Sequence, residues 1–549
     1  MLFIDVLMIA ALVTFTAIWW MKTAPRRETI LNASAGILVL CGIVGYLDYR
    51  WQAVVGGVIG LLFLAVLLIG RLRKNKERAD KKFMRYAAGT LVGLMALVGI
   101  TALYLFPVPN LPKPSGEYTV GVRNFELVDT SRLGVFMAES DEPRRLLVRA
   151  WYPAETSKGL SPKPYFTDAE AETTAASMGK LVGFGPFFTY LKHARSNSFE
   201  NAPLLKNASN QPTIFYSHGY TSYLNQNTAL MEELASHGYI IYSVQHTYDS
   251  AATLFPNGDI APTDEKMFAD TEQMVGKDAQ IPEAMEKAYS GSTYADRLDG
   301  SLLMRSEALE KNDRITAQST GVWLADRLFL HNQLQASLVP AHMNEIVRAS
   351  NFTHTGQMGM SFGGSTSGAV CMIDKRCAVG VNLDGGDFHF KAFNADIPVP
   401  FLMLYSDMQY ILAALGQQEA SINHGHNDFS YERFESAGQR KDIYRVLLKG
   451  TQHLGISDFS IFLRGPIKNL LAGEAPASVI IQSQNDFVRG FLDKHLRGLE
   501  NNFPSDQYEK YIGQVAKQNN AGVRKWWQKL DQEQRRKLEE RINSLRLSQ

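Results

Sequence analysis

The chain has 549 residues and a formal net charge of +1. This length exceeds one ordinary domain, and the near-zero charge gives no electrostatic case for binding nucleic acid. Residues 1–110 are dominated by apolar runs, whereas the remainder mixes apolar and charged residues as soluble globular proteins do. The composition therefore predicts a hydrophobic N-terminal region followed by a large globular region.

Four runs of about 20 residues in the N-terminal region are almost free of charge and long enough to cross a bilayer as helices. They are 2–21, 29–47, 51–70 and 86–106. A cleaved signal peptide is the alternative for the first run, but a basic start and a small-residue cleavage site are missing. No span carries an ionisable residue near its middle, which favours an anchor over a transport path. We predict that residues 1–110 form a four-helix transmembrane anchor.

Basic residues are distributed unevenly between the connections of these spans. The second connection offers only Asp48 and Arg50, whereas the first and third are rich in Lys and Arg: Lys22, Arg26, Arg27, Arg71, Arg73, Lys74, Lys76, Arg78, Lys81, Lys82 and Arg85. The positive-inside bias places the first and third connections in the cytoplasm. The globular region is therefore expected to be extracytoplasmic, on a protein integral to the cell membrane.

A proline-rich stretch, 107–114, reads PVPNLPKP and predicts a stiff extended segment, with residues 111–117 as the tether. The globular domain is expected at 118–500, with insertions near 250–315 and 417–440, and 501–549 as a charged amphipathic helix. Residues 119–128 and 145–152 predict two antiparallel strands at a sheet edge. The aromatic stretch 181–191 is either a buried loop or short core helix, or an acyl-binding wall or lipid-facing lip.

The middle of the chain alternates strands and helices. Strand 213–216, helix 226–237 and strand 239–244 make a parallel crossover unit. Later predicted strands are 354–360, 378–383, 399–405 and 443–448, and later predicted helices are 321–338, 362–372 and 479–496. This alternation predicts an α/β fold with a mostly parallel central sheet flanked by helices.

Residues 359–363 read Gly-Met-Ser-Phe-Gly and fit the G-x-S-x-G nucleophile elbow, a sharp strand-to-helix turn that exposes a serine hydroxyl. The pattern alone is weak in a chain with 43 glycines. Its context is the required one, since a predicted strand precedes Ser361 and a predicted helix follows it. Ser361 is therefore the predicted nucleophile of an α/β-hydrolase.

A nucleophilic serine needs a histidine base and an acid that orients it, in the chain order Ser, Asp or Glu, His. Ser361, Asp384 and His453 follow that order, and Asp384 and His453 come shortly after predicted strands. Parallel strands deliver such residues to one edge of a sheet. Asp387 and Asp407 compete with Asp384, and the order rule does not separate them. The oxyanion donors are expected to be the backbone N–H groups of Tyr220 and Phe362.

Other histidines have weaker claims. His246 also ends a predicted strand, but it precedes the serine and is interpreted as a structural or pocket-lining residue. His424 and His426 resemble a fragment of a metal site that lacks its remaining ligands. We expect no metal and no other cofactor. Cys371 and Cys377 follow the nucleophile and either form a disulfide or remain two small buried residues.

Several motifs resemble the platelet-activating-factor acetylhydrolase family over about residues 118–498. They are Ser217-His218-Gly219, Ala235-Ser236-His237-Gly238-Tyr239, the segment 359–364, Asn382-Leu383-Asp384-Gly385, and Gly450-Thr451-Gln452-His453 with Asp458-Phe459. The resemblance implies a calcium-independent α/β-hydrolase that removes short or oxidised acyl chains from phospholipids. It also implies Ser361, Asp384 and His453 as the triad, with Tyr220 and Phe362 as oxyanion donors. Met360, where members of the family often have histidine, the insertions and the four spans depart from the common pattern.

The leading hypothesis is a membrane-anchored serine esterase that acts on lipid-like or other small carboxylic esters. A peptidase or polyester hydrolase on the same scaffold is the alternative among enzymes, because a fold does not fix a substrate. A non-catalytic membrane sensor or binding protein is the alternative outside them, although a binding module needs no nucleophile.

Overall fold

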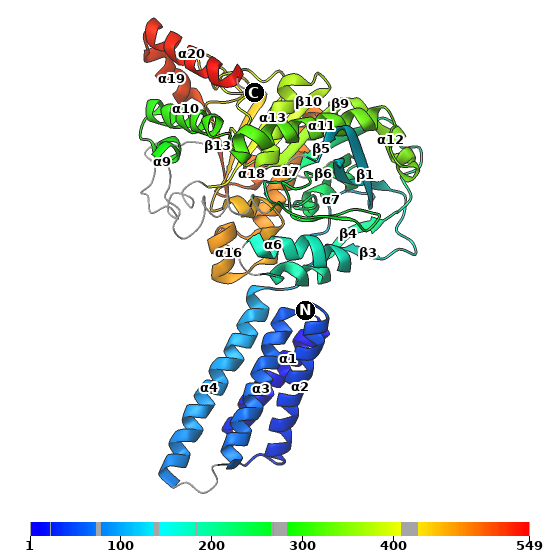
Figure 1. Cartoon of the computed structure of the whole chain (residues 1–549), viewed down its shortest axis with the longest axis vertical. Coiled ribbons are helices and arrows are strands. Elements are labelled where there is room, and N and C mark those ends of the chain that lie inside the picture. The colour runs from blue at the N-terminus through cyan, green and yellow to red at the C-terminus, as the bar shows by residue number, and fades with distance from the viewer. Residues whose placement is uncertain are drawn as a thin grey trace.

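The computed structural model of the chain describes residues 2–21, 23–72, 78–134, 142–181, 185–264, 267, 283–407 and 427–547. Figure 1 shows a narrow bundle of helices joined end-on to a wide globular domain. The N-terminus lies at the end of the bundle that meets this domain. These are the two regions that the composition predicts.

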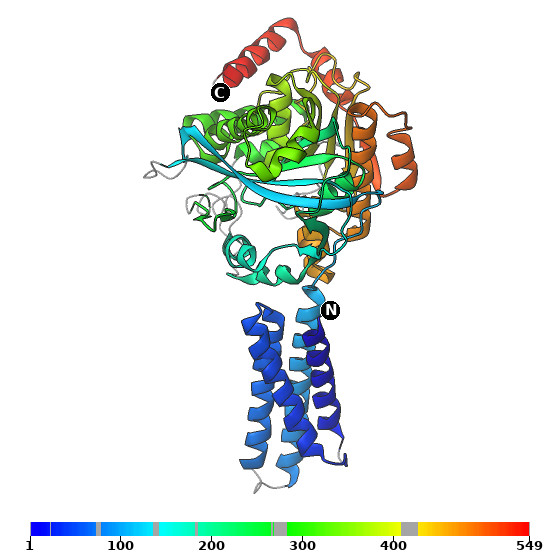
Figure 2. The same cartoon turned by 90° about the vertical axis from the view of Figure 1, so that its right-hand side faces the viewer.

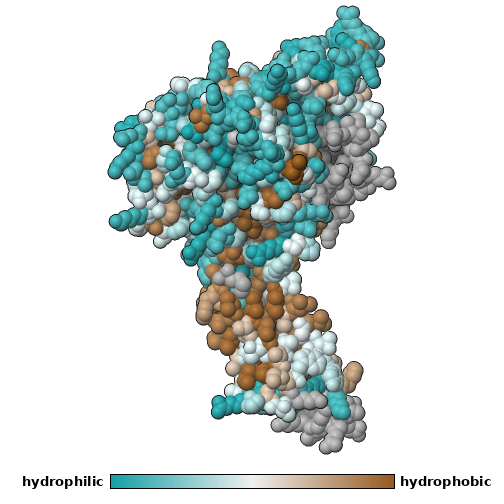
Figure 3. Space-filling model, turned by 180° about the vertical axis from the view of Figure 1, so that it is seen from behind, coloured by the Kyte–Doolittle hydropathy of each residue, from teal (hydrophilic) through white to brown (hydrophobic). Residues whose placement is uncertain are grey.

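The bundle consists of four helices, each long and apolar enough to cross a membrane. They are α1 (Phe3–Trp20), α2 (Arg27–Leu47), α3 (Trp51–Leu72) and α4 (Arg78–Leu105). Glycines allow two of them to approach closely: a Cβ added to Gly42 of α2 would lie 2.5 Å from Gly57 Cα of α3. Figure 3 shows apolar residues gathered on the bundle beneath a largely polar globular domain. The four predicted spans thus correspond to four helices.

The globular domain is built on one twisted sheet, which has eleven strands in the described part of the chain, in the order β13-β12-β11-β10-β9-β5-β6-β2-β1-β4-β3. The strands are β1 (Thr119–Leu133), β2 (Pro143–Ala154), β3 (Pro162–Pro164), β4 (Arg195–Glu200), β5 (Gln211–Ser217), β6 (Ile240–Gln245), β9 (Ser350–Met360), β10 (Cys377–Leu383), β11 (Phe401–Tyr405), β12 (Ile443–Leu448) and β13 (Val515–Gln518). A separate hairpin joins β7 (Thr253–Leu254) to β8 (Ile260–Ala261).

The centre of the sheet is parallel. Strands β6, β5, β9, β10, β11 and β12 pair in parallel with their neighbours, and β2 and β13 add antiparallel strands on either side. The carboxyl ends of the six parallel strands therefore lie at the same edge of the sheet. This is the predicted α/β-hydrolase fold.

Helices cover both faces of the sheet, as Figure 2 shows. One face packs on α7 (Thr228–Ser236) and α17 (Ala477–His495), through a core that includes Leu230 and Phe491. The other face packs on α11 (Thr320–Gln335) and α12 (Asn344–Ala349). Helix α13 (Phe362–Ile373), which follows Ser361, packs beside α11. A disulfide joins Cys371 of α13 to Cys377 of β10.

Shorter helices surround this frame. The α-helices are α5 (Asp168–Glu170), α6 (Ala176–Leu181), α9 (Glu283–Ser290), α10 (Tyr294–Glu310), α15 (Phe459–Phe462), α16 (Gly465–Ala472), α18 (Ser505–Lys510), α19 (Ala521–Lys529) and α20 (Gln532–Leu547). The 3₁₀ helices are η2 (Phe187–His193), η4 (Ala341–Met343) and η5 (His453–Ile456), and the π-helices are η1 (Ala171–Ala175) and η3 (Arg314–Ser319).

Two predictions about the sheet edges and the C-terminus were wrong. The strands β1 and β2 are not at the edge, because the short strands β4 and β3 continue the sheet beyond them. Residues 501–549 are not one helix: they contain α18, the edge strand β13, α19 and α20. The four residues of β13 are too few to show an alternating pattern. The predicted apolar stripe does pack against the domain, where Trp527 and Ile542 join a cluster with Phe434.

The predicted aromatic stretch 181–191 lies at the junction between the bundle and the domain. The ring of Phe187 stacks on Trp51 at 5.0 Å and meets Phe106 edge-on at 4.8 Å between centroids. Phe188 and Tyr190 are buried, and Phe184 lies outside the described residues. In the described part of this stretch, the aromatic side chains thus belong to a packed junction.

Polar contacts reinforce the same junction. Arg50 is buried, forms an ion pair with Asp5 at 3.0 Å, and lies over the ring of Tyr190. Lys192 pairs with Asp48 at 2.9 Å. The proline-rich segment that leaves the bundle runs along β4, where the Leu111 amide donates to the Arg195 carbonyl. The domain is therefore held on the bundle by contacts outside the connecting chain.

Candidate active site

Ser361 lies on the sharp turn between β9 and α13, at the carboxyl edge of the sheet. Its φ of 55° is in the left-handed region, which costs a non-glycine residue energy and is typical of a nucleophile elbow. The turn also brings backbone segments very close together. A Cβ added to Gly359 would lie 2.2 Å from the Gly363 carbonyl carbon, so glycine is required there.

The structure brings the three predicted residues Ser361, His453 and Asp384 into one hydrogen-bonded chain. The distance from His453 Nε2 to Ser361 Oγ is 3.0 Å, and that from His453 Nδ1 to Asp384 Oδ2 is 2.7 Å. The Asp384 carboxylate is buried, whereas the His453 side chain is 39% exposed. The histidine ring is therefore open to solvent, whereas the carboxylate that bonds it is shielded from water.

Asp384 is fixed by the strand that follows it. Ser406, directly after β11, donates to Asp384 Oδ1 through its amide at 2.7 Å and to Oδ2 through its hydroxyl at 2.6 Å. Together with the His453 ring, these donors favour the ionised carboxylate. No role was predicted for Ser406 from the sequence, although its place directly after a predicted strand was a usable signal.

The two rival carboxylates have other partners. Asp407 Oδ2 accepts from the Gly450 amide at 3.0 Å, and its own amide donates to the Thr451 carbonyl. Asp407 therefore orients the segment that leads to His453. Asp387 accepts from Asn427 Nδ2 at 2.6 Å, and burial raises its pKa to about 6. Of the three candidates, Asp384 is the one that hydrogen-bonds the histidine ring.

The residues predicted as oxyanion donors lie on either side of the serine. Phe362 begins α13, so its amide is among those that lack a partner within the helix. The loop that carries Tyr220 lies against the nucleophile, since a Cβ added to Gly219 would be 3.3 Å from Ser361 Cβ. The rings of Tyr220 and Phe362 are 5.6 Å apart.

Gln226 supports this loop and was not predicted from the sequence. Its Oε1 accepts from the Gly219 amide at 2.8 Å, and its Nε2 contacts Met360 Sδ at 3.2 Å. One buried side chain thereby links the loop at Gly219 to Met360, the residue before Ser361. Methionine at position 360 provides the sulfur that completes this link.

His246 forms a second Ser-His-Asp array that is entirely buried. Its ring bonds Ser217 Oγ and Asp326 Oδ2, both at 2.9 Å, and stacks on Trp323. Arg327 donates to Ser217 Oγ at 2.8 Å, which directs the hydroxyl proton toward His246 Nε2. Burial lowers the pKa of His246 to about 4. The predicted structural role of His246 fits this closed network beneath the oxyanion loop.

Asp458 ties the histidine segment to the helix after the oxyanion loop. Its carboxylate accepts from the Thr228 amide at 2.7 Å and from the Tyr165 hydroxyl at 3.0 Å. Burial raises the pKa of this carboxyl well above its usual range. The bonded position of Asp458, five residues after His453, fixes the loop on which the base sits.

No group of three or more His, Cys, Asp or Glu residues suited to a metal ion occurs among the described residues. His424 and His426 lie outside them.

A family model for "platelet-activating factor acetylhydrolase, isoform II" matches residues 105–287. The platelet-activating factor acetylhydrolase of the dog is 23% identical over 415 residues, which cover 73% of this chain and 80% of the dog protein. The guinea-pig enzyme of the same name is 24% identical over 73% of this chain and 81% of its own length. A probable 1-alkyl-2-acetylglycerophosphocholine esterase from Arthroderma benhamiae is 22% identical over 73% of this chain and 93% of its own length.

The family resemblance is confirmed. The matched residues 105–287 include the loop that carries Tyr220 and the helix α7, while the longer alignments reach beyond them. A solved ferulic acid esterase from Streptomyces cinnamoneus is also similar, with a TM-score of 0.48 and 19% identity over 75% of this chain and 99% of its own. The chain is a carboxylic ester hydrolase.

Proposed function

We propose that the chain is a membrane-anchored serine esterase in which Ser361, His453 and Asp384 form the catalytic triad. The observation that carries this proposal is the hydrogen-bonded chain from Ser361 Oγ through the His453 ring to Asp384. A binding protein needs no such chain, and the exposed His453 beside a strained serine is the arrangement that acyl transfer requires.

The residues account for each step of ester hydrolysis. Ser361 Oγ attacks the ester carbonyl carbon while His453 Nε2 takes the serine proton, and the N–H groups of Tyr220 and Phe362 stabilise the oxyanion. The tetrahedral intermediate then loses the alcohol, which takes its proton from His453. Water, activated by the same histidine, hydrolyses the acyl-enzyme. Asp384 remains ionised and stabilises the imidazolium.

The proposed substrate is a phospholipid with a short or oxidised sn-2 acyl chain, cleaved without calcium. The names of the relatives support an acetylated glycerophospholipid, and the position of the bundle supports a substrate supplied from a bilayer. Three leucines are exposed beside His453 and on the neighbouring helix α16: Leu454, Leu470 and Leu471. The Arg464 amide, directly before α16, donates to the Leu105 carbonyl at the end of α4.

We propose these three exposed leucines as the lipid-facing surface, a role for which the aromatic stretch 181–191 was one candidate. Phe187, Phe188 and Tyr190 are engaged at the junction, whereas Leu470 is 68% exposed on α16, the start of which contacts the end of α4. An apolar surface in that position favours contact with lipid over contact with water.

We further propose that the domain is extracytoplasmic. Basic residues at the end of the bundle away from the domain support this orientation. Arg27 and Arg85 both donate to the Trp19 carbonyl there. Only one basic residue, Arg50, lies in the second connection, where it is paired with Asp5.

Two measurements test the enzymatic proposal. A fluorophosphonate probe should label the full-length protein but not Ser361→Ala, which keeps the fold because only a hydroxyl is removed. Next, kcat/KM should be compared for phospholipids with sn-2 acetyl, hexanoyl and palmitoyl groups, with EDTA present. We expect phospholipids with acetyl to hexanoyl chains to have a higher kcat/KM than the palmitoyl phospholipid, as the names of the relatives suggest. Each added methylene should change kcat/KM by roughly 10 to 200-fold at most.

The opposite outcomes identify the alternatives. Labelling that persists in Ser361→Ala would exclude this serine as the nucleophile. Faster turnover of palmitoyl chains would contradict the acyl-chain assignment, and faster cleavage of peptides or polyesters than of any phospholipid would favour the other hydrolase classes.

A further inference from the structure

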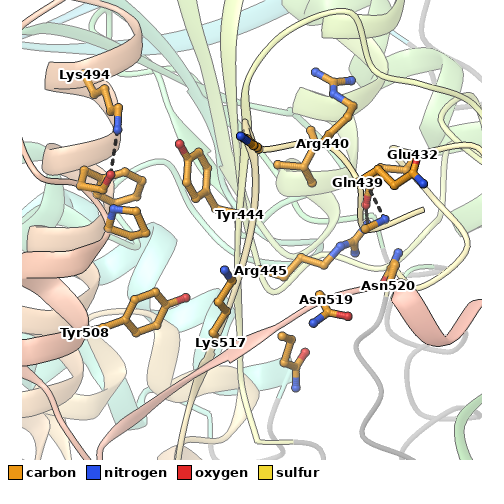
Figure 4. Close-up of a pocket in the computed structure, with 16 residues that line it drawn as sticks. Glu432, Gln439, Arg440, Tyr444, Arg445, Lys494, Tyr508, Lys517, Asn519 and Asn520 are labelled. Atoms are coloured by element: carbon orange, nitrogen blue, oxygen red, sulfur yellow. Dashed lines mark hydrogen bonds and ion pairs between the residues drawn. The ribbon is translucent and has the colours of Figure 1, made fainter. Parts of the chain in front are cut away.

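A cavity of about 410 Å³ opens at the β12–β13 edge of the sheet. Figure 4 shows the side chains that surround it. It is formed by the start of β12, the end of β13, the loop before β12, and the segments around the end of α17 and α18. Its volume is within the range of sites that bind small molecules. No residue of the candidate triad contributes to its lining.

The cavity is separated from the triad by the length of a strand. Ile443, Tyr444 and Arg445 line it from the amino end of β12, whereas His453 follows the carboxyl end. The six residues of β12 span about 20 Å at 3.3 Å each. A molecule in this cavity therefore does not reach Ser361.

The lining is strongly biased toward positive charge. Its basic members are Arg440, Lys441, Arg445, Lys494 and Lys517, and its acidic member is Glu432. Arg440 is neutralised by Asp442 and Arg445 by Glu432. Among the described residues no ion pair involves Lys441, Lys494 or Lys517, and Lys494 donates to the Phe503 carbonyl. Three ammonium groups thus remain without a carboxylate partner in one small cavity.

Arg445 forms a buried part of this lining. The side chain is almost fully buried, and its Nε has no hydrogen-bond partner among the described residues. Its two terminal nitrogens are already engaged, by the Asn427 and Ser430 carbonyls among others. Because this Nε is closed off from solvent, it is not available to a molecule in the cavity.

The rings of Tyr444, Phe503 and Tyr508 also line the cavity. Tyr444 lies 4.9 Å from Phe503, and Tyr508 packs on the same group of rings. Figure 4 shows Tyr444, Tyr508 and Lys517 on one side of the strand and Arg445, Glu432 and Gln439 on the other. This division follows from strand geometry, because neighbouring residues of β12 point to opposite faces.

We propose that this cavity is a second binding site, for a small molecule that carries an anionic group beside a planar ring. The ring would stack on Tyr444 and Tyr508 while Lys517 and Lys441 bind the anion. The basic lining selects the anion, and the rings select a planar partner over a simple inorganic ion.

Calorimetric titration of the full-length protein in detergent tests the site with three probes. They are 1-naphthyl phosphate, which has ring and charge, inorganic phosphate, which has charge alone, and 1-naphthol, which has the ring alone. We expect 1-naphthyl phosphate to bind most tightly, and its Kd to rise with salt as an exposed ionic contact requires. The double variant Lys441→Gln/Lys517→Gln should raise that Kd about tenfold.

Two control proteins show whether binding depends on this cavity. Lys529→Gln removes an exposed lysine outside the cavity and should leave the Kd unchanged. Ser361→Ala should also bind normally, so the result does not depend on the proposed triad. Equal Kd values for Lys529→Gln and the double variant, or equal affinity for all three probes, would overturn the proposal. Displacement of 1-naphthyl phosphate by fluorophosphonate labelling would instead assign the binding to the active site.

Discussion

At the residue scale, Asp384 and Asp407 follow adjacent strands but contact different parts of the candidate site. Asp384 bonds the His453 ring, whereas Asp407 bonds the Gly450 amide. We expect Asp384→Asn to lower kcat by about 10⁴-fold, because the amide favours the wrong histidine tautomer. Asp407→Asn should lower kcat far less, since it weakens one contact to a backbone segment. Steady-state kinetics on a soluble short-chain ester would measure both, and similar losses would contradict the assignment of Asp384.

A second residue-scale prediction concerns stability in acid. Burial lowers the pKa of His246 to about 4 and that of His218 to about 3, from 6.5 in the unfolded chain. Between pH 6.5 and these values the unfolded state binds more protons, so the free energy of unfolding falls as the pH falls. A shift of this size corresponds to about 3 kcal/mol for His246.

Urea unfolding of the full chain in detergent at pH 7, 6, 5 and 4 would measure this effect. His246→Gln should be less stable at pH 7 but lose less stability between pH 6.5 and 4 than the unaltered protein. Parallel pH profiles for the two proteins would show that His246 does not contribute to the acid sensitivity.

The three residues of the candidate site were easier to predict from the sequence than the residues that hold them in place. Ser361, Asp384 and His453 are recognisable because the elbow has a local pattern and the chain order is fixed by the fold. Gln226 and Asp326 act through tertiary contacts that no local pattern marks, whereas Ser406 had only its place after a predicted strand as a signal. Choosing Asp384 over Asp407 on residue evidence alone also required the distance to His453, which spacing does not supply.

At the scale of elements, the long periodic segments were predictable and the short or edge segments were not. The spans and strands β5, β9, β10 and β12 have the lengths and apolar content that single-sequence patterns detect. The three residues of β3 and the four of β13 depend on pairing with a neighbouring strand. The position of η2 against α3 depends on tertiary packing between two regions, which periodicity does not contain.

The disulfide between α13 and β10 gives a prediction at this scale. Non-reducing peptide mapping should recover a linked peptide that contains Cys371 and Cys377. Recovery of two free thiols would contradict the disulfide. Closing such a short loop is worth about 2 kcal/mol in the chain-entropy model. Cys371→Ser/Cys377→Ser should therefore lower the free energy of unfolding by about that amount, and Cys41→Ser, at a cysteine outside the bridge, serves as the control.

At the scale of the whole molecule, the proposed orientation is open to direct test. Exposed Lys158 lies in the globular domain, and exposed Arg26 lies in the first connection at the other end of the bundle. A membrane-impermeant maleimide should label Lys158→Cys in intact cells, but Arg26→Cys only after permeabilisation. The native cysteines should not interfere, since Cys41 is buried and the others are bridged. The reverse pattern of labelling would place the domain in the cytoplasm.

If the bundle spans a membrane as proposed, the junction between bundle and domain determines which surface of the domain faces that membrane. Trp51 stacks on Phe187 and meets Phe106 at 5.2 Å between centroids, and each such aromatic pair contributes about 0.5–1.5 kcal/mol beyond burial. These contacts hold α16, with its exposed leucines, next to the end of α4. If the domain were free on its connecting segment, the orientation of that surface would vary and productive encounters with bilayer lipid would be fewer.

We therefore expect Trp51→Ala to lower kcat/KM for a short-chain phospholipid in vesicles several-fold, while hydrolysis of soluble p-nitrophenyl acetate stays unchanged, because the triad is remote from this contact. Trp20→Ala is the matched control and should change neither rate, because Trp20 lies at the end of the bundle away from the domain, where it contacts Tyr86. The ratio of the two rates, measured on full-length protein in proteoliposomes, isolates positioning from chemistry. An equal loss on both substrates would mean that Trp51 stabilises the catalytic domain itself, and no loss on either would mean that the bundle acts only as a tether.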